Sequence, residues 1–150
     1  MTGYDYNGET FTFLIRGRKA SSYEQKFVYA DESNGEVFND AVYARNLAVE
    51  EKLNINIEIV ENNDGGEIND ARQYILSGDP GVDVLSSHCF RLAELAAEGT
   101  LVDFNVLPAA DLSAPYWNQN AVEQLTIANK LYLMANDISA DSLDGARFLY

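Results

Sequence analysis

Polar and charged residues follow three apolar, strand-like segments of this chain, and their side chains could recognise a small ligand. They are Gly17, Arg18 and Lys19; Ser86, Ser87 and His88; and Asn136 and Asp137. With Arg16, the first group holds three of only ten basic residues. Hydroxyl, amide and charged groups of this kind hydrogen-bond the hydroxyls or anionic groups of a ligand. A solvated loop is the alternative explanation for each group.

An aromatic pair, Tyr116 and Trp117, follows Pro115 and contains the single tryptophan of the chain. An indole ring offers an apolar face on which a sugar ring can stack. Packing inside the protein is the competing interpretation for both rings.

Motifs for bond-making chemistry are missing from the sequence. It has no glycine-rich phosphate loop and no Gly-x-Ser-x-Gly elbow. The neighbours His88 and Cys89 form a poor catalytic pair, because adjacent side chains point in different directions. One cysteine and one histidine cannot complete a zinc site, and the acidic turns lack the glycine and glutamate of a calcium loop. We therefore expect no catalytic residues, no metal and no cofactor.

The composition of the chain excludes some classes of binding partner. The chain has 150 residues, 47% of them hydrophobic, and its formal charge is −14. This acidity disfavours nucleic acid and anionic membrane surfaces, since both attract lysine and arginine. The length suggests one domain with a substantial core.

Alternating strand and helix patterns predict the elements that position the polar groups. Strands are expected over 11–15, 55–60, 82–86 and 131–135, and helices over about 35–53, 68–76, 92–98 and 115–127. Ser33 and Glu36 fit a capping box for the first helix. The residues of one predicted helix face recur at helical spacing: Phe38, Ala41, Val42, Arg45, Ala48, Val49 and Leu53.

This order predicts an α/β fold, a mostly parallel sheet with helices on both faces. Residues 1–10 are expected to be a disordered or tag-like start. Ligands of such sheets bind beyond the carboxyl ends of the strands, which is where the three polar groups fall.

An ordered series of segments resembles bacterial extracellular solute-binding proteins of ABC importers, in their sugar-binding, maltose-binding-like group. Leu95–Asp103 resembles the "LAxxGxLxDL" segment of that family, and Leu76–Leu85 resembles "ALASGDxPDVV". Asp111–Ala121 resembles "DLSKPWWN", and Asn129–Leu133 resembles the "GKLYAxP" strand. The family has two lobes that close around a ligand, and residues 11–150 resemble the first part of its N-terminal lobe.

The resemblance implies a non-enzymatic, periplasmic-binding-protein-like lobe that captures a small solute, a sugar or an oligosaccharide, in an interlobe cleft. It implies ligand contacts at Gly17, Arg18, Lys19, Ser86, Ser87, His88, Asn136 and Asp137. It further implies a truncated, monomeric chain that serves the membrane subunits of an ABC importer. The expected location is the extracellular face of the membrane or the periplasm, although the first residues carry no export signal or lipid-attachment cysteine.

Two other functions remain open at this point. An α/β enzyme could use acidic groups near strand ends, such as Asp83 or Asp137, as a carboxylate pair. An acidic interaction domain could bind a basic protein through its surface charge.

Overall fold

A computed structural model describes residues 4–17, 19–20 and 28–134 of the chain. The chain divides into two compact units, one ending at Ser87 and the other beginning at His88. The first unit holds β1 (Glu9–Arg16), α2 (Val37–Leu53), β2 (Ile55–Asn62), α3 (Glu67–Ser77) and β3 (Val84–Ser86). The second holds α4 (Cys89–Glu98), a 3-10 turn (Phe104–Val106) and α5 (Gln119–Leu125).

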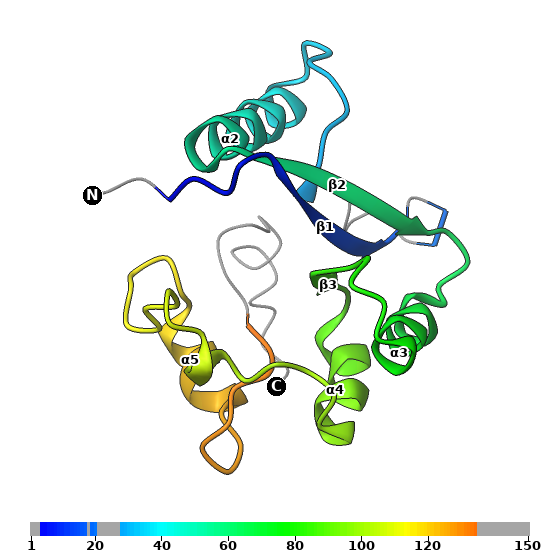
Figure 1. Ribbon diagram of the computed structural model, residues 1–150, viewed down its shortest axis with the longest axis vertical. Coiled ribbons are helices and arrows are strands. Elements are labelled where there is room, and N and C mark those ends of the chain that lie inside the picture. Colours follow the sequence, from blue (N-terminus) through cyan, green and yellow to red (C-terminus); the bar gives the residue numbers. More distant parts are fainter. Residues whose placement is uncertain (1–3, 18, 21–27, 135–150) are drawn as a thin grey trace, which may run out of the picture. The chain divides into compact units, whose positions relative to one another are not determined.

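The sheet of the first unit is parallel and has the order β2-β1-β3 (Figure 1). Phe13 of β1 pairs with Ile59 of β2 on one side and with Val84 of β3 on the other. The prediction of an α/β fold with a parallel sheet is confirmed at this level.

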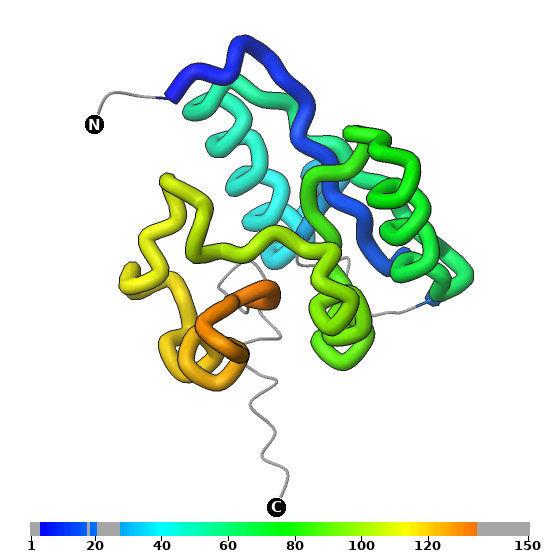
Figure 2. Tube along the Cα trace, turned by 60° about the horizontal axis from the view of Figure 1, so that its bottom comes forward, coloured from blue at the N-terminus to red at the C-terminus, as the bar shows by residue number. Residues whose placement is uncertain are grey.

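Helices α2 and α3 lie on opposite faces of the sheet (Figures 1 and 2). The chain moves from β1 to β2 in one direction and then crosses back over β1 to β3. Because parallel crossovers are right-handed, a reversal of direction places consecutive helices on opposite faces. The fully buried Leu14 and Ile15 are neighbours in β1 and so face opposite layers of the core.

The start of α2 differs from the predicted capping box. Glu36, not Ser33, is the N-cap, and its carboxylate accepts hydrogen bonds from the backbone N–H groups of Phe38 and Asn39. Asp40 accepts hydrogen bonds from the N–H groups of Asn34 and Gly35, which closes the preceding turn. The helix therefore begins at Val37, and its first donors are satisfied by carboxylates.

The predicted apolar face of α2 is wrong in most positions. Only Val42 and Asn46 are buried, while Phe38 and Val49 are each 37% exposed. Asn46 lies inside because its side-chain amide donates to the carbonyl of Val28 at 3.0 Å. A polar contact, which hydrophobic periodicity cannot detect, thus decides part of the buried face.

Helices α3 and α4 end where the sequence predicts, but their buried faces differ from the predicted ones. In α4 the buried residue is Leu95, and the predicted Ala93 is exposed. Each ends at a left-handed glycine, Gly78 for α3 and Gly99 for α4, with φ of 67° in both cases. This conformation favours glycine, because it has no Cβ. Leu76, placed on the apolar face of α3 by its spacing, is instead 83% exposed.

Two predictions for the second unit are wrong, the start of its last helix and its strand. Helix α5 begins at Gln119 rather than at Pro115, because Asn118 caps it by accepting from the N–H of Ala121 at 3.1 Å. The predicted strand over 131–135 is absent from its described residues, 131–134. Leu131 instead donates its N–H to the Asp103 carboxylate and accepts from the N–H of Phe104. Its backbone groups therefore bond to the start of the 3-10 turn and not to a neighbouring strand.

The expected disordered start contains part of the fold. Strand β1 begins at Glu9, and before it Tyr6 and Gly8 donate their N–H groups to the carbonyls of Leu53 and Asn54. The chain thus joins the turn between α2 and β2 before the strand begins. Among the described helices, none has the length and apolar character needed to cross a membrane.

Candidate functional site

The strand order places two of the predicted polar segments next to each other. In open parallel sheets, ligands bind beyond the carboxyl ends of the strands, near the point where the strand order reverses. Here β1 lies between β2 and β3, and the loops that follow β1 and β3 begin at Gly17 and Ser87. Ser86 pairs in register with Ile15, two residues before Gly17. We name this region, built from residues 16–17, 19, 62–67 and 86–87, the carboxyl edge.

Gly17 allows the first loop to lie against the end of β2. Its N–H donates to the carbonyl of Asn62 at 2.6 Å. A Cβ on Gly17 would lie 2.5 Å from Oδ1 of Asn63 and 3.0 Å from the Asn62 carbonyl oxygen. The close approach therefore requires a residue without a side chain.

Basic residues of the first loop have different surroundings. Lys19 is exposed, and its backbone N–H donates to Oδ1 of Asn63 at 3.2 Å. Arg16 is half-buried, and its Nη2 donates to the carbonyl of Ala20 at 3.3 Å. Lys19 thus presents its ammonium group to water, whereas Arg16 supports the loop. Arg18 lies outside the described residues.

The side chain of Asn62 joins β2 to the start of α3. Its Oδ1 accepts from the N–H of Gly66 at 2.8 Å, and its Nδ2 donates to Oδ2 of Asp70 at 2.6 Å. Both polar groups of this amide are therefore bonded within the protein, and they hold the turn that leads into α3. Sequence reasoning assigned no role to Asn62.

Glu67 is the second residue that sequence reasoning missed. It is the first residue of α3 and is fully buried, and its Oε1 accepts a hydrogen bond of 2.6 Å from the Ser87 hydroxyl. The N-terminal position of a carboxylate in a helix is favourable, because the helix dipole is positive there. The bond fixes Ser87, itself half-buried, at the end of β3.

The remaining predicted contacts lie elsewhere in the chain. His88 belongs to the second unit, where it is exposed, precedes α4 and stacks on Phe90 with the ring centroids 5.5 Å apart. Cys89 is the exposed first residue of that helix. Asn136 and Asp137 lie outside the described residues, so their contact with ligand stays a prediction.

The aromatic pair packs within the second unit. Trp117 meets Phe104 edge to face at 6.0 Å and lies 5.3 Å from the ring of Tyr116. The indole Nε1 is buried and makes no hydrogen bond within the described part of the chain. Tyr116 is 49% exposed, which keeps one of its faces accessible. Trp117 therefore has a packing role, and ligand stacking by either ring stays a prediction.

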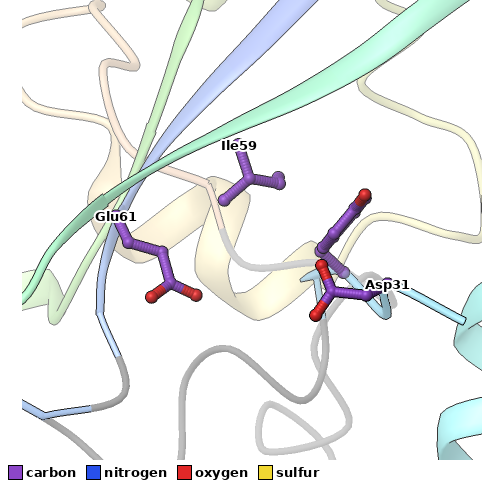
Figure 3. A pocket seen from close by; sticks show the side chains of 4 residues that line it. Asp31, Ile59 and Glu61 are labelled. Carbon is purple, nitrogen blue, oxygen red and sulfur yellow. The ribbon is translucent and has the colours of Figure 1, made fainter.

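A pocket of about 350 Å³ lies on the sheet beside the connection that leads into α2. It is lined by Tyr29, Asp31, Ile59 and Glu61 (Figure 3). Ile59 and Glu61 are two positions apart in β2 and therefore share a face. Figure 3 shows Glu61 extending from β2 toward the side on which Asp31 lies. Two carboxylates and one phenol make this pocket acidic, and no sequence motif indicated it.

Asp83, which the enzyme hypothesis named as an acidic group near a strand end, lies away from the carboxyl edge. It precedes β3, at the amino end of the sheet. Its Oδ2 accepts from the N–H of Thr12 at 2.8 Å, and its own N–H donates to the carbonyl of Thr12 at 3.0 Å. The carboxylate therefore extends the pairing between β1 and β3 and has a structural role.

Comparisons with protein-family models, curated proteins and solved structures return no match to this chain. Among the described residues, no three histidine, cysteine or acidic side chains are grouped so as to hold a metal ion. The carboxyl edge combines hydroxyl, amide and carbonyl groups with the exposed charges of Lys19 and Asp64, and this set suits reversible hydrogen bonding of a solute.

Proposed function

We propose that this chain is the substrate-binding component of an ABC importer and captures a small solute, a sugar or an oligosaccharide. The observation that carries the proposal is the position of Gly17 and Ser87 at the neighbouring carboxyl ends of β1 and β3. Open parallel sheets bind their ligands there. The sequence resemblance selected the same two loops independently of the strand order.

The chemistry of the edge supports binding rather than turnover. Hydroxyl and amide groups hydrogen-bond sugar hydroxyls. Asp83, which the enzyme hypothesis needs beside the ligand, extends the sheet at its opposite end. The proposal therefore assigns no catalytic residue and no cofactor.

In this proposal the chain is part of the first of two lobes, and ligand binding closes them around a hinge. The closed form is what the membrane subunits of the importer recognise. The protein accordingly works outside the cell membrane or in the periplasm, as a monomer.

Ligand-dependent stability tests the proposal. The chain is mixed with maltose and maltotriose, and unfolding is followed with and without each sugar. A ligand that binds the native state raises the melting temperature in proportion to its saturation. We expect such a rise, and we expect Ser87→Ala to weaken sugar binding about tenfold, a loss of roughly 1.4 kcal/mol.

Ser77→Ala is the matched control. Ser77 is also a hydroxyl bonded within the first unit, donating to the carbonyl of Tyr74 at 3.1 Å, but it lies at the far end of α3. Equal loss of binding in both variants would contradict a site at the carboxyl edge. Cleavage of maltotriose by the wild-type chain would favour the enzyme hypothesis instead. Salt-sensitive binding to a basic protein, without any response to sugars, would favour the interaction domain.

A further inference from the structure

Strand β2 has a backbone donor that points away from the rest of the sheet. In the sheet that the structure describes, β2 is an outer strand and pairs with β1 on one side. The carbonyls of Asn54 and Asn62 accept from N–H groups of the β1 side, those of Gly8 and Gly17. Ile57 lies an odd number of positions from both asparagines. Because backbone groups alternate in direction along a strand, the N–H of Ile57 points outward.

Glu50 of α2 accepts this outward donor. Its Oε1 lies 2.8 Å from the backbone nitrogen of Ile57. Glu50 is half-buried in the last turn of α2, and its carbonyl accepts from the N–H of Asn54, the left-handed residue that ends the helix. The chain therefore turns directly from α2 into β2, which brings the helix end beside the strand. The carboxylate occupies the place where a carbonyl of an added strand would bond.

A second carboxylate has the same relation to the sheet on its other side. The pairing of β1 with β3 begins at Phe13 and Val84, so the N–H of Thr12 lies just before it. Oδ2 of Asp83 accepts this N–H at 2.8 Å. Carboxylates thus bond strand donors at two places where strand pairing stops, and Glu50 is the one of the two on an outer strand.

We propose that Glu50 blocks the outer edge of β2 and prevents a second copy of this chain from pairing with it. Exposed strand edges pair with one another, and two copies of one strand are self-complementary when a two-fold axis makes them antiparallel. Strand β2 has eight residues, with isoleucine at three alternate positions, and this composition favours pairing. The bonded carboxylate removes one donor from the edge and repels the carbonyl oxygens of an approaching strand.

Net charge opposes the same association by a different mechanism. Each copy has a formal charge of −14, so two copies repel each other. Salt screens this repulsion over about 10 Å at 0.1 M, whereas the hydrogen bond of Glu50 acts at contact. Added salt therefore weakens the charge barrier and leaves the barrier at the strand edge in place.

Sedimentation of the 150-residue chain tests the proposal. We expect the wild-type chain to stay monomeric with added NaCl, and Glu50→Ala to form a dimer that strengthens with salt. Glu50→Gln retains an acceptor oxygen and should associate at least tenfold more weakly than Glu50→Ala. Glu51→Ala, the same charge change at the exposed neighbouring position, is the matched control and should stay monomeric. A folded, monomeric Glu50→Ala, or equal association of Glu50→Ala and Glu51→Ala, would overturn the proposal.

Amide exchange of Ile57 identifies the surface. We expect slow exchange in the wild-type chain, and fast exchange there would overturn the proposal without any variant. In Glu50→Ala the amide should exchange quickly in the dilute monomer and slowly in the dimer. A dimer in which it still exchanges quickly would place the contact elsewhere and contradict the proposal.

Glu50→Asp replaces Glu50→Ala if the latter fails to fold. It retains the charge and withdraws the carboxylate from Ile57 by one methylene group. A folded Glu50→Asp whose Ile57 amide exchanges quickly, yet which stays monomeric at high salt, would also overturn the proposal. None of these measurements involves a sugar, so their outcome is independent of the proposed solute binding.

Discussion

A methyl group on the Cα of Gly17 would lie 2.5 Å from Oδ1 of Asn63, closer than two such atoms can approach. The two residues belong to the loops after β1 and β2, and the same Asn63 oxygen accepts a hydrogen bond from the N–H of Lys19. This contact holds the first ligand loop against the end of the sheet. It makes the spacing of the carboxyl edge depend on one glycine.

Gly17→Ala is expected to destabilise the first unit by about 1 kcal/mol, because the added methyl group overpacks a closed contact. Urea unfolding of both proteins measures the difference. Asn63→Ala removes the group that the methyl would strike, so the double variant should recover part of the loss, a coupling of at least about 0.5 kcal/mol. Strict additivity of the two changes would contradict the contact.

Asp83 is expected to contribute to folding and not to activity. Asp83→Ala removes the acceptor of the Thr12 N–H and should cost about 1 kcal/mol in the free energy of unfolding. Asp83→Asn keeps an oxygen in place and should cost less. Chemical denaturation of the two variants measures both effects, and a loss of sugar binding in Asp83→Asn at unchanged stability would return this residue to the ligand site.

Removal of the Asn46 side chain should loosen the connection that lines the acidic pocket. Asn46 is buried, and its amide and the guanidinium of Arg45 both donate to the carbonyl of Val28. Burial lowers the pKa of Arg45 from its ordinary value. Asn46→Ala should therefore cost about 1–2 kcal/mol. Urea unfolding tests this, with the exposed Asn69→Ala as a control that should stay within about 0.5 kcal/mol of wild type.

Acid is expected to unfold the second unit partly through Asp103. Hydrogen bonds from the N–H groups of Leu131 and Asn105, in that order of effect, lower the pKa of its carboxyl group. A pKa lower in the folded state than in the unfolded chain stabilises the protein above the unfolded value, near 3.9, and this contribution disappears as the pH falls through the folded value.

Fluorescence of Trp117, the single tryptophan, reports this effect, because the indole packs on Phe104 inside the second unit. The melting temperature should fall as the pH is lowered from about 5 to about 2. Asp103→Asn should flatten the decrease, since it removes the titrating group. Glu123→Gln, an equal charge change at an exposed position of α5, serves as the control. Identical pH profiles for Asp103→Asn and wild type would refute this role.

The sequence by itself determined the local elements of the first unit and the termini of two helices. Alternating isoleucines predict β2, and the structure has a strand there over Ile55–Asn62. Gly78 and Gly99 mark the ends of α3 and α4, because left-handed termini favour glycine wherever the helix packs. These features depend on neighbouring residues alone, so they can be predicted from a single sequence.

Tertiary structure decided what depends on distant residues. Glu67 acquires its place at the candidate site through a hydrogen bond from Ser87, twenty residues further along the chain, and no periodicity encodes such a pair. Leu131 follows a strand-like pattern, yet its N–H bonds to the Asp103 carboxylate, and residues 131–134 form no strand. Backbone groups form hydrogen bonds with the partners that the fold brings within reach, so long-range packing decides which groups pair.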